Sequence, residues 1–182
     1  PVTLRRVLYL GDPGTASALT SAELAAGASW CRVASDGVVL ERNGGLPPAA
    51  PADDEPLTVI LPGEWVTLLT ARVPVRGDSR ALAAVPNLIE DELATAIEDN
   101  HYAVGPPLAG GERQVAVIER ALLQRILVSL TAVGLVPHAL VVDALLVPAQ
   151  QNELTVVEFG ERYLAATADR STVVVGRDQL GL

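Results

Sequence analysis

Apolar and polar positions alternate in short runs along most of the chain, which is the pattern of β-strands. Ser35-Asp36-Gly37 separates two such runs, and Asp-Gly between apolar runs predicts a hairpin because both residues tolerate positive φ. A Pro62-Gly63 turn joins two others. The strands predicted from these runs are 7–10, 30–34, 38–41, 57–61, 66–73, 114–118 and 139–142, followed by a C-terminal meander of 154–159, 163–167 and 172–175.

Two longer segments carry the helical period. Over 79–100, with Asp78 or Ser79 as N-cap, the apolar side chains fall on one stripe, and Pro86 is expected to kink or split the helix. The second helix covers 120–133 and ends at Gly134, a natural C-cap. A shorter Ala-rich helical turn is expected at 21–26. Helices embedded among strands predict a mixed α/β architecture.

The stretch LPPAAPADDEP, residues 46–56, interrupts this pattern. Proline lacks the amide donor that a β-ladder needs, and this stretch has almost no large apolar side chain. It is therefore predicted to be a linker between substructures.

Charge narrows the classes of partner. The chain has 13 basic residues, all arginine, against 22 acidic ones, for a net charge of −9. Such a domain repels phosphate backbones and anionic lipid, so binding to nucleic acid and to headgroups is disfavoured. Cys31 is the only cysteine and is interpreted as a packing residue, since no internal disulfide is possible. With neither a membrane span nor a signal peptide in view, the sequence predicts a soluble chain.

No catalytic constellation can be assembled from the motifs. His101 and His138 are isolated and are interpreted as structural, and zinc-protease, serine-hydrolase and Walker A sequences are missing. We therefore expect no catalytic residue, no metal and no cofactor. RGDS at 76–79 spells an adhesion tetrapeptide, but Asp78 is better explained as a helix start.

Carboxylates are concentrated in one part of the chain. Between Ala81 and Glu112 the sequence has six acidic residues and no arginine. Consecutive positions such as Glu90-Asp91-Glu92 diverge by about 100° on a helix, so they cannot converge on one substrate atom. They form either a solvated face or a docking face for a basic partner.

Two acidic-x-Gly turns are reminiscent of the phosphate-binding hairpins of actin-like ATPases. These are Asp12-Pro13-Gly14-Thr15 and Glu158-Phe159-Gly160. In the first, Pro13 removes an amide donor where phosphate should dock, and in the second, Glu158 is a methylene longer than Asp. This pattern favours an actin-like scaffold without nucleotide chemistry.

An ordered set of segments resembles a known family. VILPGEWVTLLTARVPV, followed by ALAAVPNLIEDELATAIEDNHYAVG, is similar to the cytoplasmic domain of type II secretion system protein L, and the resemblance covers roughly 57–175. It implies an α/β, actin-like (ribonuclease H-like) fold of mixed sheets with an inserted α/β subdomain and a partial second lobe. In that division, residues 1–50 and 112–148 form the first lobe, 56–111 the inserted strand-strand-helix subdomain, and 149–182 the start of the second lobe.

The resemblance also implies a function. Such a domain would be a non-catalytic adaptor that recruits the secretion ATPase, through that enzyme's N-terminal domain, to the cytoplasmic side of a bacterial inner membrane. Contact with the membrane and with platform protein M would be made through parts outside this sequence, and homodimerisation is left open. Two alternatives remain: an actin-like ATP-binding protein, and a type IV pilus assembly scaffold of the same fold.

Candidate partner-binding residues lie in the acidic region. They are the exposed carboxylates and one apolar residue off the buried stripe: Leu88, Glu90, Asp91 and Glu98. A free strand edge in the predicted 57–73 hairpin is the alternative docking site, by strand addition.

Overall fold

The computed structural model describes residues 4–11, 19–49, 55–75, 77–148, 153–159, 162–167 and 172–176. The Asp12–Thr15 turn, Arg76 and Gly160, on which some of the sequence arguments rest, lie outside these residues. The chain divides into two compact units, here called unit 1 (1–62 with 124–146) and unit 2 (63–123 with 147–182).

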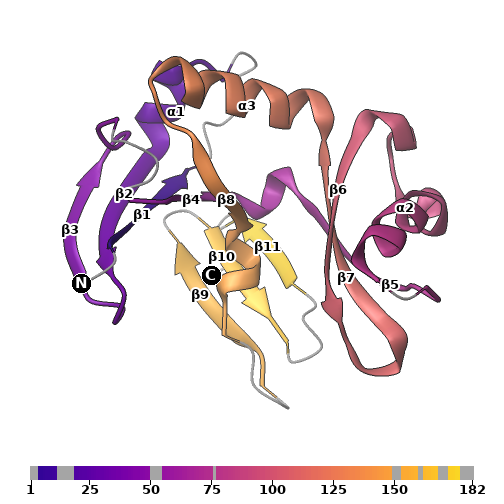
Figure 1. The fold of residues 1–182 in the computed structure, drawn as a ribbon. Coiled ribbons are helices and arrows are strands. Elements are labelled where there is room, and N and C mark those ends of the chain that lie inside the picture. The colour runs from indigo at the N-terminus through magenta and orange to yellow at the C-terminus, as the bar shows by residue number, and fades with distance from the viewer. Residues whose placement is uncertain are drawn as a thin grey trace. The chain divides into compact units, whose positions relative to one another are not determined.

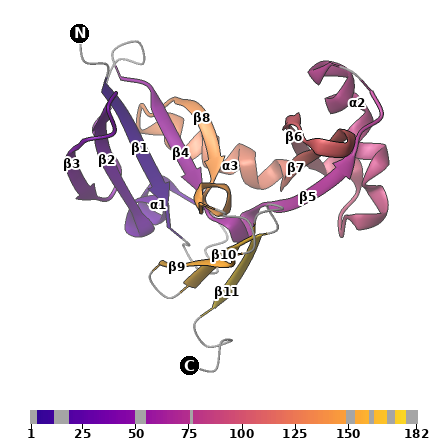
Figure 2. The same ribbon diagram turned by 90° about the horizontal axis from the view of Figure 1, so that it is seen from below.

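Unit 1 contains a five-stranded mixed sheet in the order β3-β2-β1-β4-β8 (Figures 1 and 2). β2 pairs antiparallel with both β1 and β3, whereas β4 runs parallel to β1 on one side and to β8 on the other. The strands are β1 (Leu4–Leu10), β2 (Ala28–Ala34), β3 (Val39–Gly44), β4 (Leu57–Leu61) and β8 (Pro137–Val142).

One face of this sheet is buried with two helices. Leu8 on β1 and Val59 on β4 represent its buried positions, which alternate with half-exposed ones along these two strands, and Trp30 on β2 is buried too. The helices are α1 (Ser21–Gly27) and α3 (Arg120–Ala132), which lie side by side in Figure 1. The Ser21 hydroxyl donates to the carbonyl of Ser129 at 2.7 Å, and the Ser129 hydroxyl donates to that of Leu19 at 2.6 Å.

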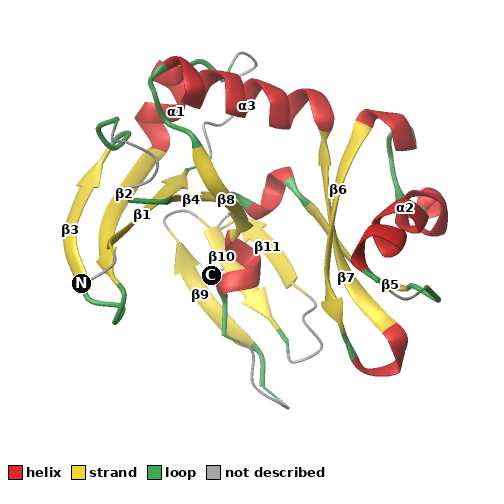
Figure 3. Ribbon diagram, in the orientation of Figure 1, coloured by secondary structure: helices red, strands yellow, loops and turns green. Residues whose placement is uncertain are grey.

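Unit 2 contains an antiparallel sheet in the order β5-β7-β6, with α2 on one face (Figure 3). Its elements are β5 (Thr67–Arg72), α2 (Asp78–Leu88), β6 (Asn100–Pro107) and β7 (Glu112–Glu119). The buried core between them comprises Ala71, Val73, Ala81, Val85, Ile89, Val115 and Val117. The Arg113 guanidinium, almost fully buried, bonds the Asp78 carboxylate at 2.8 Å and so ties the start of α2 to β7.

A separate three-stranded antiparallel sheet follows in the chain. It comprises β9 (Thr155–Phe159), β10 (Arg162–Ala166) and β11 (Thr172–Gly176), in sequence order. The predicted C-terminal meander is therefore confirmed. Five short 3₁₀ turns complete the described elements: η1 (Gly63–Trp65), η2 (Glu90–Glu92), η3 (Ile97–Asp99), η4 (Ala109–Gly111) and η5 (Asp143–Leu146).

The predicted helix over 79–100 is wrong in its second half. α2 ends at Leu88, and the remainder is η2 and η3 joined by extended residues. Pro86 removes a donor from the last turn of α2, and Ile89, fully buried, turns into the core instead of continuing the helix. Leu93 still packs against the same core by this irregular route, so the apolar stripe survives without the helix.

The predicted 57–73 hairpin does not form. β4 lies in the interior of the unit 1 sheet, whereas β5 pairs with β7 in unit 2. The strand at 112–119, expected in the first lobe, pairs with β5 and β6 instead. The apolar run Leu57–Leu61 is typical of a strand between two parallel neighbours, which explains its place.

Candidate functional site

Five carboxylates of unit 2 gather in a short irregular connection between α2 and β6, here called the acidic segment (residues 89–99). The side chains of Glu90, Asp91, Glu92, Glu98 and Asp99 are all exposed. None of them takes part in an ion pair with another described residue. In the described part of the chain, no three acidic, His or Cys side chains are grouped to hold a metal ion. The segment therefore presents negative charge to solvent.

The backbone of the acidic segment is anchored from several directions. Asn100, buried at 3% exposure, donates from Nδ2 to the Thr95 hydroxyl and to the Ala96 carbonyl, both at 2.9 Å. The Tyr102 hydroxyl donates to the Ile97 carbonyl at 2.9 Å. The bonds to the Ala96 and Ile97 carbonyls hold the main chain of the segment in place, so little conformational entropy would be lost when a partner binds.

Arg120 holds the end of the segment. Its guanidinium donates from Nε to the Glu98 carbonyl at 3.3 Å and from Nη2 to the Asn100 carbonyl at 2.9 Å. This role of Arg120 is not predictable from the sequence, because the position of an arginine at a predicted helix start does not indicate which carbonyls its guanidinium will bind.

The four predicted partner-binding residues all lie in unit 2, and all are exposed. Leu88 is the last residue of α2 and is 45% exposed. Glu90 and Asp91 are consecutive in η2, and Glu98 lies in η3. A 3₁₀ turn separates consecutive side chains by about 120°, so Glu90 and Asp91 still diverge. The arrangement suits contact with an extended charged surface rather than chelation of one atom.

Strand addition at β4 is ruled out by its position, since both of its edges are already paired. In the β5-β7-β6 sheet the edge strands are β5 and β6.

The end of β1 departs from a phosphate-binding hairpin. Leu10 pairs with Ala28, and the Gly11 amide donates to the Gly27 carbonyl at 3.0 Å. A side chain on Gly11 would collide with that carbonyl oxygen. The two strands are therefore joined at this point by a long excursion that includes α1, where an actin-like ATPase would have a tight turn.

Asp143 lies at the same end of the unit 1 sheet as Gly11. It follows β8, is only 4% exposed, and lies with Oδ2 3.5 Å from the hydroxyl of Tyr9 on β1. Of the two predicted phosphate-turn acids, Asp12 lies outside the described residues, and Glu158 is on β9 opposite Tyr163 and is exposed.

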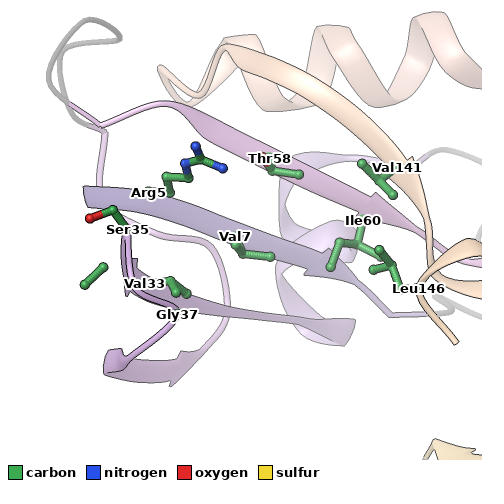
Figure 4. Close-up of a pocket in the computed structure, with 10 residues that line it drawn as sticks. Arg5, Val7, Val33, Ser35, Gly37, Thr58, Ile60, Val141 and Leu146 are labelled. Carbon is green, nitrogen blue, oxygen red and sulfur yellow. The ribbon is translucent and has the colours of Figure 1, made fainter. Parts of the chain in front are cut away.

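The half-exposed face of the unit 1 sheet is hollowed (Figure 4). The hollow has a volume of about 380 Å³. Ten residues from β1, β2, the β2–β3 turn, β4, β8 and η5 line it: Arg5, Val7, Val33, Ala34, Ser35, Gly37, Thr58, Ile60, Val141 and Leu146. The lining is mostly apolar, with one charged side chain at one end. No helix among the described residues is long and apolar enough to cross a membrane.

Comparison with known proteins agrees with this architecture. The family model of type II secretion system protein L matches residues 48–182. The type II secretion system protein L of Pseudomonas aeruginosa is 32% identical over 68 residues, which are 37% of this chain and 18% of that protein. The chain thus aligns with less than a fifth of the length of this curated relative.

Two solved structures share the fold. The cytoplasmic domain of EpsL, an inner membrane component of the type II secretion system of Vibrio cholerae, superposes with a TM-score of 0.73 at 19% identity, covering 97% of this chain and 73% of that one. A chain of the PilM–PilN type IV pilus biogenesis complex gives a TM-score of 0.58 at 14% identity, covering 94% and 61%.

The mixed α/β, actin-like fold expected from the sequence is thereby confirmed. Because the family model spans well over half of the sequence, the chain belongs to the type II secretion system protein L family.

Proposed function

We propose that this chain is the adaptor domain through which a type II secretion platform recruits its secretion ATPase to the cytoplasmic face of the bacterial inner membrane. Membership of the protein L family makes it a component of that system. The Vibrio cholerae neighbour is described as the cytoplasmic domain of an inner membrane component, which supports the location. Anchoring in the membrane and pairing with platform protein M would be carried by parts of the full protein beyond this sequence.

The proposed docking surface is the acidic segment together with Leu88. The observation that carries the proposal is that these carboxylates are exposed on a backbone anchored by hydrogen bonds from Asn100, Tyr102 and Arg120. A one-signed field steers a basic partner and raises the rate of encounter. The exposed Leu88 beside it supplies an apolar contact of the kind found at the centre of interfaces. The partner surface is therefore expected to be basic around an apolar pocket.

The proposal includes the absence of catalysis. Three features support it: the carboxylates of η2 diverge, Gly11 and Gly27 close the β1–β2 connection, and the net charge is −9. A nucleotide brings further negative charge, which such a domain would have to neutralise.

Co-purification with the N-terminal domain of the cognate secretion ATPase tests the recruitment. We expect a stable complex in gel filtration. Isothermal calorimetry with ATP and Mg²⁺ tests the second claim, and no heat of binding is expected. Micromolar ATP binding would instead favour the actin-like ATP-binding alternative. Binding to a pilus alignment protein, with none to the secretion ATPase, would favour the pilus scaffold.

A further inference from the structure

The outward face of the unit 1 sheet carries an apolar strip that the proposed function does not use. Alternate residues of each strand point away from the buried face, and the register places them next to one another. Arg5 lies opposite Val33, Val7 opposite Thr58, and Ile60 opposite Val141. The strip therefore crosses four neighbouring strands, β2, β1, β4 and β8.

The hollow in this face has two different ends (Figure 4). Arg5 and Ser35 lie at one end, and Ile60, Val141 and Leu146 gather at the other. Ile60 is level with Tyr9, four residues along β1 from Arg5. At about 3.3 Å per residue the strip is roughly 13 Å long, which matches about nine residues of an α-helix at 1.5 Å each.

Arg5 indicates which charge a molecule bound in the hollow should carry. It is the one charged residue among the ten that line the hollow. Its side chain is exposed, and no described residue is hydrogen-bonded or ion-paired with it. In a chain of net charge −9, a cation that has no partner among the described residues and lies above an apolar floor is complementary to a carboxylate flanked by apolar side chains.

The secondary structure of the occupant follows from backbone hydrogen bonding. The floor is formed largely by β1 and β4, which are paired on both edges, so an added strand finds no free ladder groups there. A helix satisfies its own backbone and packs its apolar face on a sheet. We propose that this hollow is a docking site for an amphipathic helix of a partner protein, with a carboxylate at one end of its apolar stripe seated on Arg5.

The site is tested with two synthetic helical peptides of 14 residues. Both carry Leu at four positions spaced i, i+3, i+7 and i+10 on an Ala/Gln background, and they differ only in having Glu or Lys at both ends, which makes helix direction irrelevant. The methyl NMR signals of Val7, Ile60 and Val141 are followed during titration into the complete chain. We expect the Glu peptide to shift these signals and to bind about three- to tenfold more tightly than the Lys peptide.

Reversing the charge of the site should reverse this preference. Arg5→Glu is expected to favour the Lys peptide by a similar factor, whereas Arg42→Glu, on β3 outside the hollow, changes the net charge equally and should leave the order unchanged. The proposal is overturned if the two peptides bind equally, if neither shifts these methyl signals up to about 1 mM, or if the same signals move with protein concentration alone. The last result would identify a second copy of the chain as the occupant.

Discussion

The guanidinium of Arg32 on β2 forms a bidentate ion pair with the carboxylate of Glu55, with Nε 3.1 Å from one oxygen and Nη2 2.9 Å from the other. Arg6 on β1 also binds Glu55, through its main-chain carbonyl. Its guanidinium, 4% exposed, donates to the carbonyls of Glu55 at 3.2 and 3.3 Å and of Pro48 at 2.8 Å. The described ends of the proline-rich linker are thus bound to the sheet, and its carbonyls serve as acceptors for a buried cation.

Glu55→Gln should destabilise unit 1 by about 1–2 kcal/mol, because it removes the charge that Arg6 and Arg32 share while Arg6 remains buried. Trp30 lies on β2 in unit 1, so its fluorescence in a Trp65→Phe background reports urea unfolding of this unit. Glu41→Gln is the control, since Glu41 is 3.8 Å from Arg32 with both side chains about 40% exposed, and it should cost less than about 0.5 kcal/mol. Equal losses in the two variants would contradict the assigned role of Glu55.

The two glycines Gly11 and Gly44 should respond differently to the same substitution. Gly11→Ala places a methyl group against the Gly27 carbonyl and is expected to cost about 1–3 kcal/mol, as overpacking does. Gly44→Ala meets no atom within 4 Å and should change stability by less than about 0.5 kcal/mol. Urea unfolding followed at Trp30 measures both. A neutral Gly11→Ala would show that the β1–β2 connection is not as close as described.

Leu88 and Ile89 are adjacent in sequence but differ in environment. Ile89→Ala empties a fully buried position in the unit 2 core and should cost about 2–5 kcal/mol. Leu88→Ala removes a side chain that is 45% exposed; it should leave stability almost unchanged but weaken the complex with the ATPase domain. Denaturant melts and binding titrations of the same two proteins separate the effects. Full binding by a folded Leu88→Ala variant would remove Leu88 from the proposed surface.

Association with the ATPase domain should depend on salt. If the acidic segment steers its partner, the association rate should fall as ionic strength rises from 0.05 to 0.5 M, and the triple variant Glu90→Gln, Asp91→Asn, Glu98→Gln should lose most of that dependence. Stopped-flow fluorescence measures both rates. Glu41→Gln with Glu112→Gln serves as a control, because it removes exposed charge away from the segment. A rate insensitive to salt would argue against docking at the carboxylates.

The stability of the protein should depend on pH through the Glu23 carboxyl at the start of α1. The Thr20 backbone amide donates to the Glu23 carboxylate at 2.7 Å, and the Thr20 hydroxyl donates to it at 2.8 Å. These bonds lower the pKa of Glu23 below its ordinary value, against a smaller opposing effect of burial. A lowered folded-state pKa stabilises the protein above the unfolded value, and this contribution is lost as pH falls through the folded value. The stability difference between wild type and Glu23→Gln should therefore be larger at pH 7 than at pH 3. A carboxyl NMR titration gives the pKa directly, and an ordinary value would refute the capping bond.

Local pattern predicted the elements of this fold better than their partners. Alternation located nearly every strand, and the period of 120–133 located α3, since these signals come from neighbouring residues. Membership of β4 in the unit 1 sheet depends on pairing with Val141 and Val142, which no local window contains. The apolar stripe does not distinguish a continuous helix from two 3₁₀ turns, because Leu93 packs against the unit 2 core by the irregular route as well.

The candidate site was predictable only in part. Exposure of Leu88, Glu90, Asp91 and Glu98 follows from their position off the apolar stripe, and the structure agrees; their role in binding remains a proposal. The sequence does not indicate which residues anchor the acidic segment. Its anchors are Asn100, Tyr102 and Arg120, and each donates to a main-chain carbonyl, a group that every residue has.

The place of β4 has a consequence for biosynthesis. Val59 pairs with Leu140, 81 positions later, and all of the 63–123 segment lies between them. During translation, the edge of β4 that pairs with β8 therefore has no partner strand until the chain has emerged past Val142. Closing such a long loop slows folding, and until then apolar surface is exposed to incorrect pairing. Early folding of the β5-β7-β6 sheet with α2 would shorten that effective loop, so the 63–123 segment is expected to become protease-resistant first during translation.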